Sequence, residues 1–306
     1  MLKPTLSLEK QLELLKSRGL LIPDEEFAAH YLSENSYYHL NIYFKCFQKK
    51  TDYVDELGND IYEFFDNTTF KHVVQVHEND KQIRSVLLKA IMPIELKIRT
   101  AIAYYVGLAR GSDCFYLDDP KTYPAIEKIK ALRSRFENSL DNNNPIVRHH
   151  TSKYNFKFPL FAIFELMSFS FLIDYFELLS FSVQDKIANK YFGLPSSGTM
   201  INWMKCINDL RNICAHQNFL YTRLFNREPK FFDTKLLYSN YRKTLYAYCI
   251  VIGYLSNKRD WLTFITELDD LNNKRKLLNL KSYGFDPDWS SRLETVPQLF
   301  RPFYPR

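Results

Sequence analysis

Apolar residues recur at helical spacing along most of this chain. The clearest stripe starts at Ile83 and continues in steps of three or four through residues 87, 91, 94, 98, 101 and 105. Such steps follow the 3.6-residue turn of an α-helix, so we predict a long helical region here. Pro93 falls inside the stripe, and we expect it to kink the helix or to start a new one.

The same periodicity appears in other segments, and we expect most of the chain to be helical. The further predicted helices cover residues 6–16, 24–32, 37–47, 123–140, 159–181, 183–191, 200–220, 234–255 and 259–271. Residues 51–60 are polar and acidic and residues 141–145 are rich in asparagine, so both segments are predicted loops. Alternation of apolar and polar positions, which would indicate strands, does not extend over a convincing length.

The fold class that follows from these elements is all-α, with four longer helices suited to one bundle. We expect an N-terminal helical module over residues 1–65, a helical bundle over residues 66–260, and a C-terminal helix with an extended tail over residues 261–306. The 8 glycines and 13 prolines are few for an all-β fold. The 21 tyrosines and 25 phenylalanines suit an aromatic core, and stacking surfaces for bases are the alternative.

Charge and cysteine content set few limits on partners and location. The net charge of +6 permits a polyanionic partner without demanding one. Five widely spaced cysteines indicate neither a disulfide framework nor a zinc site, and we interpret them as buried thiols in a reducing compartment. The N-terminus has no apolar signal core, so we expect a cytoplasmic protein.

The apolar run over residues 158–181 is the most membrane-like segment. It contains Glu165, Asp174 and Glu177, each of which costs about 2.5–3.5 kcal/mol near the centre of a bilayer. We therefore interpret the run as a buried helix and expect no membrane partner. A buried Glu165 needs an oppositely charged partner, for which Arg99 and Arg211 are the candidates.

The residues with the clearest chemistry are Arg211, Asn212 and His216, within the predicted helix over residues 200–220. Histidine can exchange a proton near neutral pH, and arginine can hold a phosphate and stabilise the charge that develops on it. RNA supplies its own nucleophile, the 2′-hydroxyl. The pattern therefore indicates RNA cleavage without a metal or another cofactor. The structural alternative is an asparagine that forms hydrogen bonds inside the helix and a histidine favoured at its C-terminus.

Helical geometry places these side chains on different faces. At 100° per residue, Asn212 lies about 40° and Asp209 about 20° from His216, so the three form a polar stripe. Arg211 lies about 140° from His216. Either the arginine side chain curls round, or the helix ends near His216, or a second subunit completes the site. A symmetric dimer would bring two copies of the motif together.

Residues 210–216 read Leu-Arg-Asn-Ile-Cys-Ala-His, which resembles the R-N-x-x-x-H signature of HEPN ribonucleases. The wider chain, from about residue 6 to residue 228, resembles the Abi-like proteins of bacteria (abortive infection, AbiD/AbiF type). The stretches that carry this second resemblance are residues 17–22, 35–40, 94–100, 150–154 and 159–169. Residues 223–226, Arg-Leu-Phe-Asn, resemble the family's R-L-W-N element in a displaced position.

The resemblance implies a HEPN-like helical bundle that acts as an endoribonuclease toxin in bacterial phage defence. Such a protein would work as a cytoplasmic homodimer with a composite active site, and an RNA or protein antitoxin would hold it in check. Arg211 and His216 would be catalytic, and Asn212 would orient the histidine or the phosphate. The residues expected to support them are Glu165, Asp209, Glu95 and Arg99, of which the last two, by spacing alone, form a surface ion pair.

Basic residues near the middle of the chain are candidates for contacts with the RNA backbone. Arg148, Lys153 and Lys157 would form a modest basic rim. Two other functions remain open. One is a non-catalytic RNA-binding or interaction protein on the same bundle. The other is a DNA-binding regulator that uses residues 1–50, although no basic recognition face is visible there.

Overall fold

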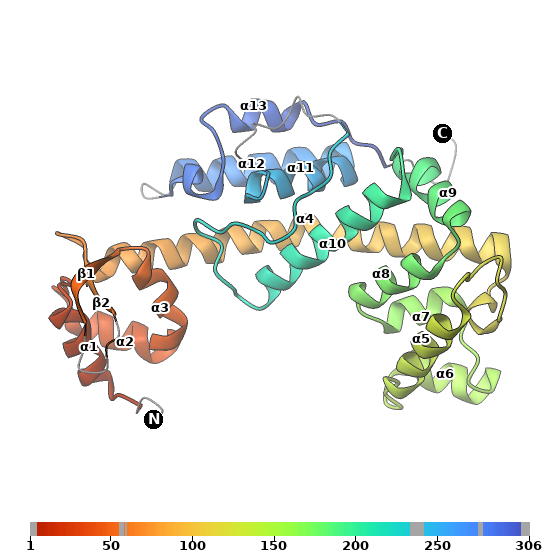
Figure 1. Ribbon diagram of the computed structural model, residues 1–306, viewed down its shortest axis with the longest axis horizontal. Helices are drawn as coiled ribbons and strands as arrows, with labels where there is room; N and C mark the ends of the chain where they lie inside the picture. The colour runs from red at the N-terminus through yellow and green to blue at the C-terminus, as the bar shows by residue number, and fades with distance from the viewer. Residues whose placement is uncertain (1–4, 55–57, 59, 233–241, 275–277, 301–306) are drawn as a thin grey trace.

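The computed structural model describes residues 5–54, 58, 60–232, 242–274 and 278–300 (Figure 1). The N-terminal elements are α1 (Leu8–Ser17), α2 (Glu25–Asn35), α3 (Tyr37–Lys45), β1 (Gln48–Val54) and β2 (Asp60–Phe64). The strands pair antiparallel, so the prediction of a loop over residues 51–60 was wrong at its two ends. A small hairpin with mostly exposed side chains has no strong apolar alternation, which explains why the pattern did not reveal it.

A single helix, α4 (Phe70–Arg110), runs along the whole molecule (Figure 1). It begins where the Thr69 side chain accepts a hydrogen bond from the backbone N–H of His72, and it ends at Gly111. Pro93 lies inside this helix, so it does not start a new one. Ile91 and Ile94 on either side of the proline are buried against other helices. Burial of this stripe outweighs the local cost of the proline, because packing supplies most of a helix's stability.

The remaining helices follow α4 in the chain. They are η1 (Cys114–Tyr116), α5 (Ile126–Asn138), α6 (Pro145–Tyr154), α7 (Leu160–Leu166), α8 (Phe169–Leu178), α9 (Phe181–Phe192), α10 (Ser197–Ala215), α11 (Leu245–Leu255), α12 (Lys258–Lys274), η2 (Leu280–Tyr283) and α13 (Trp289–Glu294). The prediction of one helix over residues 159–181 was wrong, because the Ser168 side chain accepts from the N–H of Phe171 and caps a second helix. The predicted start of α11 at residue 234 lies outside the described residues.

The chain is therefore mostly helical, as predicted, and its helices gather along α4. In Figure 1, α11, α12 and α13 lie along one side of α4, while α5 to α8 lie near the end that carries Arg110. The helix α10 crosses α4 and packs against it, and also packs against α8, α9 and α11. Within the described ranges, no helix is both long and apolar enough to cross a membrane.

Buried apolar residues form two clusters. The smaller runs from Leu12 to Val76 and includes the N-terminal helices and the start of α4. The larger runs from Ile83 to Val296, so α4 contributes to both clusters. The boundary that we expected between residues 260 and 261 lies inside α12, whose apolar residues belong to the larger cluster. All five cysteines are free thiols; Cys46 is partly exposed and the other four are buried.

Candidate functional site

The end of α10 decides how the Arg211 to His216 motif is presented. The helix begins at the Ser196 cap and buries Ile207, Leu210 and Cys214. Its last helical residue is Ala215, and the next residue, His216, is the C-cap, with φ −90° and ψ 12°. Of the three arrangements left open by the sequence, the helix does end at the histidine. The His216 side chain is exposed to solvent.

Arg211 is held against α4 by a carboxylate. Its Nε atom lies 3.5 Å from Oε1 of Glu95, and its Nη1 atom donates to Oδ1 of Asn212 at 3.3 Å. The arginine side chain is 44% exposed, whereas that of Glu95 is 16% exposed. Burial raises the pKa of Glu95 above its usual value, and the guanidinium groups of Arg211 and Arg99 offset this only in part. The guanidinium thus keeps an accessible side while its other side faces the carboxylate.

Two other expected site residues meet beside this pair. Nη1 of Arg99 lies 3.9 Å from Oε2 of Glu165, and its Nη2 donates to the carbonyl oxygen of Met167 at 3.4 Å. Arg99 is therefore the partner of Glu165, one of the two candidates named from the sequence. The expectation that Glu165 is buried was wrong, since its side chain is 53% exposed. It lies near the end of the short helix α7, after the buried residues Ile163 and Phe164.

His216 stands apart from the other motif side chains. Among the described residues, no hydrogen bond or ion pair joins its imidazole to Arg211, Asn212 or Asp209. Oδ2 of Asp209 instead accepts from Nε of Arg227 at 2.9 Å. The polar stripe deduced from helical geometry therefore does not act as one hydrogen-bonded unit. The chain after the motif folds back along α10, and it is this segment that supplies Arg227 as the partner of Asp209.

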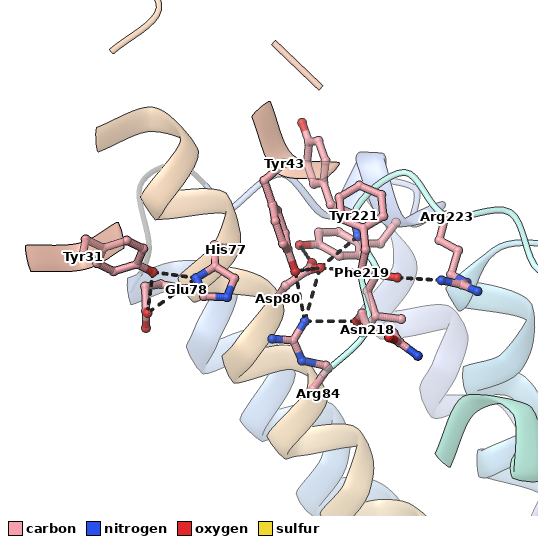
Figure 2. Close-up of polar contacts among 12 residues, drawn as sticks. Tyr31, Tyr43, His77, Glu78, Asp80, Arg84, Asn218, Phe219, Tyr221 and Arg223 are labelled. Atoms are coloured by element: carbon pink, nitrogen blue, oxygen red, sulfur yellow. Dashed lines mark hydrogen bonds and ion pairs between the residues drawn. The ribbon is translucent and has the colours of Figure 1, made fainter. Parts of the chain in front are cut away.

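A buried carboxylate holds the turn that follows His216 (Figure 2). Asp80 on α4 is fully buried and accepts from the backbone N–H of Leu220 at 2.7 Å. Its Oδ2 also accepts from the Tyr43 hydroxyl at 3.0 Å, and its Oδ1 from the Tyr283 hydroxyl at 2.6 Å. Four segments that are distant in the sequence, α3, α4, the turn and η2, thus meet at one carboxylate. Burial raises the pKa of Asp80, and these hydrogen bonds oppose that shift.

Arg84, one helical turn after Asp80, completes this network (Figure 2). Its Nη1 lies 3.5 Å from Oδ2 of Asp80 and donates to the Tyr43 hydroxyl and to the carbonyl oxygen of Asn218, both at 3.2 Å. The arginine side chain is only 3% exposed. Neither residue was predicted from the sequence. A signal was present in the sequence: both charged residues lie on the helix face that carries Ile83, and a face that packs against a core is normally apolar.

A model of the family described as Abi-like protein matches residues 30–222. The match covers more than half of the chain and includes α4, α10 and the motif. The chain belongs to the Abi-like protein family. No curated protein and no solved structure matches it.

In this Abi-like protein, the basic residues expected at the RNA backbone lie on and after α6. Arg148, Lys153 and Lys157 are all exposed. The neighbouring His150 is buried, and its Nδ1 lies 3.1 Å from the carbonyl oxygen of Lys157. The helix α6 lies near the Arg110 end of α4, whereas α10 ends closer to the middle of α4 (Figure 1). Among the described residues, no ion pair or hydrogen bond connects these basic side chains to the motif.

Proposed function

We propose that this Abi-like protein is an endoribonuclease that acts in abortive infection, as a toxin that limits phage growth. The exposed His216 at the end of α10, five residues after Arg211, supports this proposal most directly. Both side chains are open to solvent, so a phosphodiester can approach them without prior opening of the fold. The family membership supports the biological role, and the side-chain chemistry supports the reaction.

In the proposed reaction, the 2′-oxygen of a ribose attacks the adjacent phosphorus, and the bond from phosphorus to the 5′-oxygen breaks. His216 transfers a proton in this step, a contribution of about 10²- to 10⁴-fold in rate. Arg211 stabilises the negative charge on the phosphoryl oxygens. Glu95 and Asn212, which contact the Arg211 guanidinium, orient it. The products carry a 2′,3′-cyclic phosphate and a 5′-hydroxyl, and no metal ion takes part.

We further propose that two copies of the chain form the complete site. Because no hydrogen bond or ion pair joins Arg211 to His216 within the described residues of one chain, a symmetric partner would supply the missing neighbour for each. Met92 and Leu96 on α4 are exposed apolar residues beside Glu95, which favours a protein contact at this position. In the resting cell, an RNA or protein antitoxin would cover the same surface.

The other predicted residues take supporting parts in this proposal. Arg99 and Glu165 form the edge of the site beside Glu95, and Arg148, Lys153 and Lys157 would contact RNA further along its backbone. Residues 1–65 would form a separate module, and residues 66–260 the ribonuclease bundle, followed by the C-terminal segment over residues 261–306.

Purified wild-type protein and His216→Ala, incubated with total bacterial RNA in EDTA, test the reaction. We expect new 5′-hydroxyl ends with the wild type and none with His216→Ala. His30→Ala is the matched control, because His30 is exposed on α2 and should not affect cleavage. A strict requirement for Mg²⁺, or equal cleavage by His216→Ala, would contradict the mechanism. Should the purified protein need a trigger, the same variants are induced in a bacterial host during phage infection.

Non-catalytic RNA binding is the competing function. Within the described residues no side chain orients the imidazole of His216 for proton transfer, and this observation favours a role that does not need the histidine. Such a role predicts that wild type and His216→Ala bind RNA equally and that neither produces new ends. The same experiment therefore separates the two functions.

A further inference from the structure

A pocket of about 420 Å³ opens beside α10, on the side where Asp209 lies. Its polar lining comes from Asp209, Asn212, Arg223, Asn226, Arg227 and Tyr248. The volume falls within the range of about 300–1,000 Å³ that is typical of small-ligand sites. Two guanidinium groups, two carboxamides and one carboxylate make the lining polar and, on balance, positively charged.

The two arginines of the pocket differ in their partners. Arg227 is paired with Asp209 at 2.9 Å. Arg223 has no ion pair with any described carboxylate; its Nη1 donates to the carbonyl oxygen of Phe219 at 3.0 Å, and its buried Nε has no hydrogen-bond partner. Figure 2 shows Arg223 on the side of the turn that faces away from Asp80. The positive charge of Arg223 is therefore available to an anion that enters the pocket.

The walls of the pocket are held in place by aromatic packing. The Phe225 and Tyr248 rings are stacked, with centroids 4.0 Å apart, and the Tyr248 hydroxyl donates to the carbonyl oxygen of Arg227 at 2.8 Å. The Arg223 guanidinium lies 5.9 Å from the centre of the Phe225 ring. A planar guanidinium that is held in this way loses little conformational freedom when it binds a phosphate.

Asn212 connects this pocket to the motif. It lines the pocket, and its Oδ1 accepts from Nη1 of Arg211. We propose that the pocket binds a nucleotide of single-stranded RNA next to the scissile phosphate, with the Arg223 guanidinium on the phosphate and the Asn226 carboxamide near the sugar or base. This assignment rests on the proposed ribonuclease function, because the motif defines which phosphate is cleaved.

Binding is tested in the His216→Ala background, so that RNA stays intact during the measurement. The probe is a fluorescein-labelled, mixed-sequence RNA 12-mer, and anisotropy gives Kd at several salt concentrations. Adding Arg223→Gln should raise Kd about tenfold or more, because a hydrogen-bonded charge on the phosphate is lost. The slope of log Kd against log salt should fall by about 0.7, the value for one phosphate contact on a single strand.

Arg135→Gln is the control, since Arg135 is an exposed arginine that pairs with Asp174 and does not line the pocket. It should leave both Kd and the salt slope close to their starting values. Because Arg223 also holds the carbonyl of Phe219, its removal can disturb the turn. Arg223→Lys keeps the charge without the planar fork, and we expect it to keep the salt slope while binding more weakly.

The possible results separate this assignment from the proposed reaction. Normal binding by Arg223→Gln, a rise in Kd without a change in salt slope, or no RNA binding by the parent would each overturn the pocket assignment. If 5′-hydroxyl ends still appear with the wild-type protein, the proposed reaction stands in each case. Conversely, loss of binding with a reduced slope, in a protein that makes no new ends even during phage infection, supports RNA binding in the pocket and refutes the catalytic function.

Discussion

Replacing Asp80 by asparagine should destabilise the protein strongly, although the side chain keeps its shape. Oδ2 of Asp80 accepts from the backbone N–H groups of Leu220 and Tyr221, at 2.7 and 3.3 Å, and lies 3.5 Å from Arg84. Oδ1 accepts from the Tyr283 hydroxyl at 2.6 Å. An amide provides one acceptor oxygen in place of two and carries no charge, so it cannot satisfy all these donors.

The size of the effect follows from the burial of this pair. Asp80 is fully buried, and the Arg84 side chain is 3% exposed. Removal of one partner from a buried ion pair costs about 3–5 kcal/mol, because the remaining charge has no compensation. We therefore expect Asp80→Asn to lower the free energy of unfolding by about 3–5 kcal/mol. Tyr283→Phe removes a single hydrogen bond to the carboxylate and should cost about 1.5–3 kcal/mol.

Urea unfolding, followed by circular dichroism, measures these changes. The matched control is Asp270→Asn, whose exposed ion pair with Lys274 should contribute less than about 1 kcal/mol. Native-state amide hydrogen exchange gives a local test, since the amides of Leu220 and Tyr221 donate to Asp80. Both amides should exchange faster in Asp80→Asn, even if the variant remains folded.

A loss below about 1 kcal/mol for Asp80→Asn would refute the view that this carboxylate compensates a buried charge. Unchanged exchange at Leu220 and Tyr221 would refute its role in holding the turn. If the turn fixes the direction of His216, Tyr283→Phe should also slow RNA cleavage while leaving RNA binding unchanged. Equal cleavage rates would show that the histidine is positioned independently of this network.

Two further predictions concern pH and backbone conformation. Burial lowers the pKa of His77 from 6.5 to about 4. Between pH 6.5 and pH 4 the histidine is therefore protonated in the unfolded chain and neutral in the folded one. The free energy of unfolding should fall by about 2 kcal/mol as the pH is lowered from 7 to 5. Urea titrations should show a smaller fall for His77→Gln, and an equal fall would contradict this. Gly284 has φ +86°, and a Cβ added there would lie 2.3 Å from the Cβ of Thr244. Gly284→Ala should therefore lower the free energy of unfolding by about 1–3 kcal/mol and Tm by several degrees. In the control Gly107→Ala, on α4 with open space around the added Cβ, Tm should rise; similar Tm changes in both variants would be inconsistent with this reasoning.

Local signals in the sequence were sufficient for most of the helices. The apolar stripe from Ile83 lies inside α4, and the polar residue Asp24 caps α2, where its side chain accepts from the N–H of Phe27. Periodicity and capping depend on residues within one or two helical turns, so the sequence contains them directly. The residue types of the motif, Arg211 and His216, were equally visible, and their chemistry alone defines a candidate reaction.

Other features depended on contacts between distant parts of the chain. Whether Pro93 would interrupt α4 was decided by the helices packed on both sides of it, and residue spacing alone could not reveal this. The partner of Asp209 proved to be Arg227, 18 positions later, because the chain folds back after the motif. In both cases a long-range contact outweighed the local preference that the sequence displays.

The direction of His216 is the clearest example of this division. The sequence specifies a histidine five positions after Arg211, and helical geometry alone would place the two on different faces. The structure ends α10 at Ala215 and holds the following turn through Asp80 and Arg84 on α4. The buried carboxylate that accepts from this turn lies 136 residues before the histidine. Only the tertiary structure, which brings those residues together, decides the direction of the histidine.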